Sequence, residues 1–151
     1  MTGNTIHSLK HWTRAVTDAA QHYVFPSHLS LAYRFFAGKL PDVLVARDEP
    51  PAGWDKNTPI VLIKDGGGGR IHHLQLADRR VTFEVRAPDG EAAEALATRV
   101  FELMRTWPFE AAPVYLPGPL PLPQYFPLDE PRLPAYVWTV TVTVKSVQLS
   151  N

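Results

Sequence analysis

The distribution of proline is the feature that most constrains this chain. Of its 15 prolines, eight lie between Pro113 and Pro134. Each proline fixes the backbone φ angle and removes a backbone hydrogen-bond donor, so this stretch cannot form a central strand of a sheet. Leucine and proline alternate over residues 116–123, which is typical of an extended, polyproline-like conformation. We therefore expect a proline-rich extended arm over residues 113–134, whose leucines need a surface to lie on.

The size and composition favour one ordinary globular domain over residues 1–151. The absence of cysteine excludes disulfides and thiolate sites. Fifteen basic and 15 acidic side chains give a formal net charge of zero, which predicts no bulk attraction to nucleic acid or membranes and favours self-association. No apolar run has the length of a membrane span, and residues 1–10 lack the apolar core of a signal peptide. We expect synthesis in the cytoplasm.

Helical spacing of apolar residues occurs in three places. Residues 8–23 predict a helix within an N-terminal extension, 1–26, that Pro26 ends. Ser27 is a candidate cap for a short second helix that closes at Gly38. The clearest helix spans 91–106, with Asp89 as its candidate cap and Pro108 after its end.

Strand patterns occupy most of the remaining chain. We expect strands at 42–46, 59–64, 80–86 and 136–148, with 71–76 extending or pairing with the third. The run Gly66–Gly69 predicts a hairpin turn. Strands and helices do not alternate regularly, so the fold class is α+β: a mixed, mostly antiparallel sheet packed by one or two helices, with the proline-rich arm added.

No residue pattern indicates catalysis, a cofactor or a metal. The glycine run lacks the lysine and following helix of a phosphate-binding loop. Histidines or acids four apart on the first predicted helix have no third ligand. Consecutive histidines on a strand point to opposite faces, and the two acidic pairs lie in proline-rich loops. The groups considered are His7 with His11, Asp18 with His22, His72 with His73, Asp48 with Glu49, and Asp129 with Glu130.

Basic residues cluster along the middle strands, at Arg70, Arg79, Arg80 and Arg86. A nucleic-acid surface would pair them with exposed aromatic residues. Four acidic residues are interspersed instead, so a mixed solvated or interface surface is the favoured interpretation, and a weak contact with DNA stays open. These acidic residues are Asp65, Asp78, Glu84 and Asp89.

Several stretches of the chain together resemble a known family. They are residues 40–45 (LPDVLV), 58–67 (TPIVLIKDGG), 78–87 (DRRVTFEVRA), the helix 91–105, and 127–144, where a Pro-Asp-rich loop precedes the last strand. This order resembles tail terminator, or head–tail joining, proteins of long-tailed phages over roughly residues 27–147. The N-terminal extension and the proline content of 113–124 depart from the family pattern.

The resemblance implies a structural virion protein rather than an enzyme, located at the head–tail interface. Such proteins form a ring, typically a hexamer, that binds the last ring of the tail tube, stops its polymerisation and receives the head. Its partners would be other copies of itself, the major tail tube protein and a head–tail connector or stopper protein, with DNA near the lumen. Within the arm we expect five residues to contact a neighbouring subunit: Leu116, Leu120, Leu122, Tyr125 and Phe126.

Three alternatives stay open at this point. The arm could fold back onto its own domain. The chain could be a head-completion or stopper protein, which shares these features. A small-molecule binding module with a cleft beneath the arm is a third possibility, which a pocket with converging polar groups would favour. The copy number of the ring, the face that meets the tube and any DNA contact in the lumen are not set by these patterns.

Overall fold

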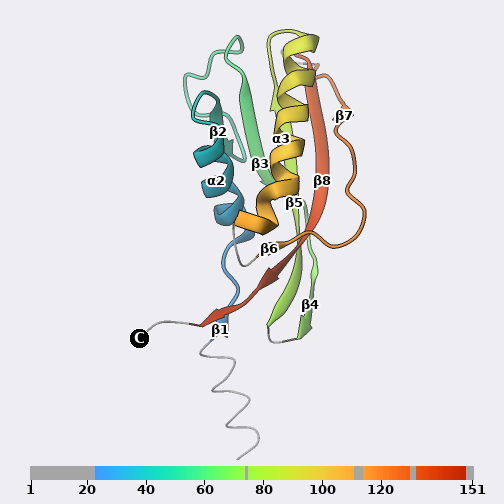
Figure 1. Cartoon of the computed structure of the whole chain (residues 1–151). Helices are drawn as coiled ribbons and strands as arrows, with labels where there is room; N and C mark the ends of the chain where they lie inside the picture. The colour runs from blue at the N-terminus through green and yellow to red at the C-terminus, as the bar shows by residue number, and fades with distance from the viewer. Residues whose placement is uncertain (1–22, 74, 111–113, 130–131, 149–151) are drawn as a thin grey trace, which may run out of the picture.

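The computed structural model describes residues 23–73, 75–110, 114–129 and 132–148. Two helices lie on one face of a seven-stranded sheet (Figure 1). The strand order is β2-β3-β5-β8-β6, and every pairing is antiparallel except that of β2 with β3. The predicted α+β class with a mixed, mostly antiparallel sheet is therefore confirmed. The helices are α2 (His28–Lys39) and α3 (Gly90–Glu110); the strands are β2 (Leu44–Arg47), β3 (Ile60–Asp65), β4 (Arg70–His73), β5 (Leu76–Arg86), β6 (Val114–Tyr115), β7 (Gln124–Tyr125) and β8 (Ala135–Lys145).

The core lies between the sheet and the helices. Alternate residues of β5 and β8 are buried on the helix side, as their alternating patterns predict. All four residues of Ile60–Ile63 in β3 are fully buried, so this strand is covered on both faces, as expected. Aromatic rings join the layers: Phe36 of α2 packs edge-on against Phe83 of β5 and against Trp107 of α3.

The glycine run is not the hairpin turn that its composition predicts. β3 and β4 both pair with the same side of β5, so together they form one long strand interrupted by Gly66–Gly69. Asp65 pairs with Val81, and Arg70 pairs with Asp78. Between these two pairs, the four residues 66–69 lie opposite only two residues of β5, 79 and 80. The run is therefore a bulge, and the hairpin closes later, where His73 pairs with Leu76. A four-glycine sequence suits a turn and a bulge equally well, which is why the pattern misled.

Both predicted helix caps are present. The Ser27 hydroxyl accepts a hydrogen bond from the Ser30 backbone N–H at 3.2 Å, and Asp89 Oδ1 accepts one from Ala92 N–H at 2.8 Å. The predicted end of the second long helix is wrong, because α3 continues through Pro108 to Glu110. A proline in the last turn removes one helical hydrogen bond, and the fully buried Trp107 beside it offsets that loss. The final turn bends toward α2 (Figure 1).

The described part of the proline-rich segment follows the edge of β8. β6 pairs with Thr143 and Val144 at one end of β8, and β7 pairs with Tyr136 and Val137 at the other. No part of it is a central strand, as predicted. Between the two short strands the chain is irregular, and Leu116 and Leu120 pack against the core of their own domain. These two contacts correspond to the alternative in which the segment folds back, rather than to an extended arm.

A second, two-stranded sheet forms below the main one. β1 (Tyr23–Val24) pairs antiparallel with β9 (Val147–Gln148), and Ser146 separates β9 from β8. The predicted strand 136–148 is thus two strands in two sheets. The third predicted strand, 80–86, begins earlier in the structure, at Leu76, and residues 70–73 form β4, which pairs with this added part of β5 in a hairpin that extends beyond the helices (Figure 1). The predicted helix over 8–23 lies almost entirely outside the described residues.

Candidate assembly surface

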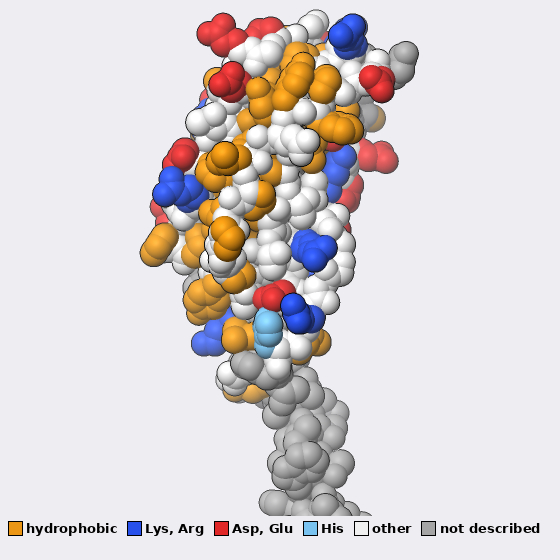
Figure 2. Space-filling model, turned by 90° about the vertical axis from the view of Figure 1, so that its right-hand side faces the viewer, with side chains coloured by type: hydrophobic (Ala, Val, Ile, Leu, Met, Phe, Trp, Pro, Cys, Tyr) orange, Lys and Arg blue, Asp and Glu red, His pale blue; other side chains and the backbone are white. Residues whose placement is uncertain are grey.

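Large apolar side chains are exposed along the edge of the molecule that carries β6 and β7. Phe109, at the end of α3, is 89% exposed, and Leu122 is 73% exposed. Figure 2 shows hydrophobic side chains gathered in a stripe along this face. A patch of this kind on a globular domain is typical of an interaction site. We call it the edge surface, and its members are Phe109, Tyr115, Leu122, Tyr125 and Phe126.

The edge surface is held in place by buried neighbours. Near the end of α3, Phe109 and Tyr115 border a shallow hollow whose floor includes Leu116 and Leu120. At the other end, Tyr125 packs against Tyr136 with ring centroids 5.4 Å apart. Phe109, Tyr115 and Tyr125 therefore lie beside partners that belong to the core or to β8, which lowers the entropy lost when the surface is covered.

The five arm residues predicted to meet a neighbouring subunit divide into two groups. Leu122, Tyr125 and Phe126 are exposed and available to a partner. Leu116 and Leu120 are partly buried against their own core. Sequence reasoning did not select Phe109, because it expected the helix to end before Pro108. Contact of any of these residues with another subunit stays a prediction.

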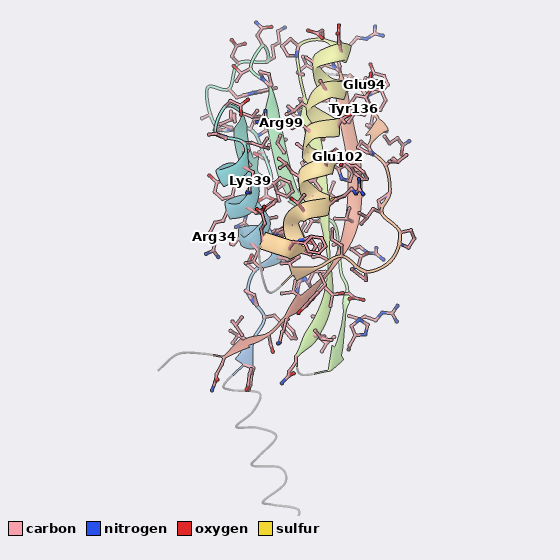
Figure 3. The ribbon with its side chains drawn as sticks, viewed as in Figure 1. Arg34, Lys39, Glu94, Arg99, Glu102 and Tyr136 are labelled. Carbon is pink, nitrogen blue, oxygen red and sulfur yellow. The ribbon has the colours of Figure 1, made fainter. Side chains whose placement is uncertain are left out.

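The helix face of the molecule is polar and ion-paired. Figure 3 shows Lys39 on α2, with Arg99 and Glu102 on α3. Lys39 Nζ lies 2.6 Å from Glu110 Oε2, and Arg99 donates to both carboxylate oxygens of Asp42 at 2.8 Å. The hydrogen bonds from Arg99 hold the pKa of Asp42 below its ordinary value. Lys39 and Arg99 of this face are therefore already engaged in ion pairs.

The outer face of the sheet, opposite the helices, carries a polar network. Glu84 is buried and is held by Arg86 at 2.7 Å and by Lys64 at 3.4 Å. Asp78 accepts from the Thr143 hydroxyl at 2.8 Å and lies 2.8 Å from His72 Nε2. Each carboxylate of this face therefore has partners on neighbouring strands, which stabilises the register of the sheet.

A buried histidine lies where α2 meets the glycine bulge. His28 is 4% exposed, and its Nε2 atom lies 3.5 Å from Asp65 Oδ1, beyond good hydrogen-bonding distance. Burial, followed by the positive charge of Arg79, lowers the pKa of His28, while Asp65 opposes that change. Sequence reasoning missed this residue because one histidine at the start of a helix has no spacing signal.

The chemical candidates from the sequence do not assemble into a site in the described residues. No group of three histidine, cysteine, aspartate or glutamate side chains there could hold a metal ion. His72 is bonded to Asp78, while Asp48, Glu49 and Asp129 are exposed. Neither described helix is long and apolar enough to cross a membrane. Three candidates lie outside the described residues, namely His7 with His11, Asp18 with His22, and Glu130.

Comparisons with known proteins do not assign a family. No protein-family model matches the chain, and no curated protein matches its sequence.

Proposed function

We propose that this chain is a structural virion protein of a long-tailed phage, which forms a ring that caps the tail tube and joins the tail to the head. The observation that supports the proposal is the edge surface, a row of exposed apolar side chains on one side of the domain. If this surface contacts a different surface of the next subunit, the contact is heterologous and closes into a ring when the rotation between subunits is suitable. The order of strands, turns and helix that resembles tail terminators is the second support.

Self-association is tested first, by light scattering of the full chain over a concentration series. We expect the mass to rise toward a hexamer of 16.9-kDa subunits. Phe126→Ser removes a side chain that is 61% exposed on the edge surface and should shift the series toward monomer. Tyr33→Ser is the matched control, because Tyr33 is an exposed aromatic residue of α2, away from that edge. A mass that stays monomeric in every series contradicts self-assembly through this surface.

Capping is tested separately with a major tail tube protein that polymerises in solution. A terminator should bind tube ends and shorten the tubes, as seen by negative-stain electron microscopy, and Phe126→Ser should weaken that effect if the ring is required. Rings that leave tube growth unchanged but bind a head connector would instead favour the stopper role. A chain that remains monomeric and binds neither partner would contradict both structural roles.

A further inference from the structure

A cluster of cations at the extended β4–β5 hairpin is not used by the edge surface. Arg70 on β4, Arg80 on β5 and Lys145 on β8 are exposed, and they lie on three adjacent strands. Their registers place them on the outer face of the sheet, away from the helices. We call these three residues the basic surface. Figure 2 shows Lys and Arg side chains beside a histidine below the hydrophobic stripe.

These cations differ from Lys39 and Arg99 in forming no ion pair within the described part of the chain, although Asp78 lies opposite Arg70 in the register and the charge of Arg70 helps to lower the pKa of Asp78. Among the described residues, no ion pair joins Arg70, Arg80 or Lys145 to a carboxylate, whereas Lys39 and Arg99 are both paired. An exposed guanidinium without a carboxylate partner keeps its donors for a ligand. The basic surface is therefore available in a way that the helix face is not.

The acidic residues that argued against nucleic acid in the sequence are engaged elsewhere. Asp78 is held by Thr143 and His72, and Glu84 by Arg86 and Lys64. The remaining two are Asp65, which accepts from Gly67 N–H and faces His28, and Asp89, which caps α3. Of these carboxylates, only that of Asp78 faces the basic surface, so three cations stand against one anion there.

The surroundings of the cations suit phosphate oxygens. Gly68, Gly69 and Thr141 line a shallow hollow together with Arg70, Arg80 and Asp78. Gly68 keeps its backbone accessible, since a side chain there would meet nothing within 4 Å, whereas Gly69 lies against the Asp78 carbonyl. Arginine forks and hydroxyls are the groups that proteins use on phosphate oxygens. Neighbouring strands lie about 5 Å apart, and alternate residues of one strand lie about 7 Å apart. These spacings allow the cations to contact more than one phosphate.

We propose that the basic surface binds the phosphodiester backbone of double-stranded nucleic acid without reading its sequence. Thr141, opposite Arg80 in the register, supplies a hydroxyl, and the large exposed aromatic residues of the described chain lie on the edge surface or on α2. Base stacking, which single-strand binding uses, therefore has no platform beside the two arginines, whereas Tyr115 lines a separate hollow with Lys145. The inference concerns the isolated chain and stands whether or not it forms a ring.

The test is fluorescence anisotropy of a short labelled DNA duplex of arbitrary sequence, with the full chain titrated at several NaCl concentrations. The double variant Arg70→Gln/Arg80→Gln should lower affinity by about tenfold or more and reduce the slope of log affinity against log salt by about two. The control Arg34→Gln/Lys56→Gln removes the same charge from exposed residues outside the basic surface. It should change affinity by less than about twofold, the change expected when no phosphate contact is lost.

Each other outcome overturns the proposal. Equal losses in the two double variants would show that net charge alone is responsible. A chain that binds inorganic phosphate, measured by NMR titration, but not the duplex would have a simple anion site. Binding of an acidic polypeptide with the affinity of the duplex would assign the surface to acidic protein partners. Circular dichroism of both double variants separates lost binding from lost folding. The single variant Lys145→Gln, measured in the same titration, tests the third cation of the surface.

Discussion

At the scale of single residues, Gly69 shows how a close backbone approach fixes an amino acid. A Cβ atom at this position would lie 1.7 Å from the Asp78 carbonyl oxygen, so β4 can begin beside β5 only without a side chain. Neighbouring Gly68 has open space around the same point, and its φ angle lies outside the left-handed region. Two adjacent glycines of one run therefore have different structural roles.

We expect Gly69→Ala to lower the free energy of unfolding by about 1–3 kcal/mol, because the two strands must separate to admit the methyl group. Gly68→Ala, the matched control, should be neutral or slightly stabilising, since it restricts the unfolded chain without a clash. Urea denaturation of both variants measures the difference. Equal stabilities would show that the strands move apart at no cost.

His28 makes stability depend on pH. Its pKa is lowered below the ordinary 6.5 by burial and then by Arg79, so the unfolded chain takes up this proton at a higher pH than the folded chain. The free energy of unfolding should therefore fall as pH drops below about 6.5, until the folded pKa is passed. The pKa of Asp42, Asp65 and Asp78 is also lowered, but from 3.8, so their contributions are lost only in stronger acid.

Denaturation of His28→Gln between pH 8 and 5 checks this expectation. The variant should lose the fall in stability that the unsubstituted chain shows in the window below about 6.5. Asp65→Asn removes the group that opposes the change and should steepen the fall. Parallel curves for the unsubstituted chain and His28→Gln would mean that the histidine is protonated equally in both states.

At the scale of elements, the last turn of α3 joins the core to the edge surface. Trp107 is fully buried and stacks against Phe35 at 6.0 Å, while Phe109, two residues later, is 89% exposed. On the two sides of Pro108, the side chain of Trp107 thus points into the core and that of Phe109 is exposed on the surface. Packing of Trp107 against α2 holds this turn in place, because the proline contributes no helical hydrogen bond there.

Trp107→Ala should destabilise the fold by about 3–5 kcal/mol, the cost of emptying a core aromatic site. Phe109→Ala should leave stability within about 0.5 kcal/mol, as an exposed substitution does. Thermal or chemical denaturation at low protein concentration distinguishes them, since self-association through Phe109 would otherwise add to its stability. A large loss in Phe109→Ala under those conditions would place this residue in the core.

The same elements show what the sequence can predict. Alternation in β5 and β8 and the apolar stripe of α3 identified the core, because burial imposes those periods directly. The glycine bulge and the helix end at Glu110 were mispredicted, because both depend on contacts distant in sequence: the pairing of β4 with β5 and the packing of Trp107. For the same reason, no pattern revealed that Asp78 is held by Thr143 and His72 of the adjacent strands, or that Lys64 of β3 reaches Glu84.

At the scale of the whole molecule, the formal net charge of zero is a sum over three surfaces that differ in charge and polarity. The helix face is ion-paired, the edge surface is apolar, and the outer face near the hairpin carries cations that form no ion pair with the described residues. The two proposed binding surfaces differ in position: one follows β6 and β7 beside β8, and the other lies on the outer face near the hairpin, where Lys145 borders Tyr115 of the first. Their physical differences predict opposite responses to salt.

Raising NaCl from about 50 to 500 mM should weaken binding of the DNA duplex steeply, since released counterions drive that contact. The same change should preserve or strengthen the oligomer, since apolar burial does not depend on charge screening. Light scattering and anisotropy on one preparation measure both responses. Phe126→Ser should alter only the oligomer, and Arg70→Gln/Arg80→Gln only the affinity for the duplex. If salt dissociated the oligomer as it released the duplex, charge rather than the edge surface would hold the subunits together, and the assembly contact would have to be sought among the cations of the hairpin.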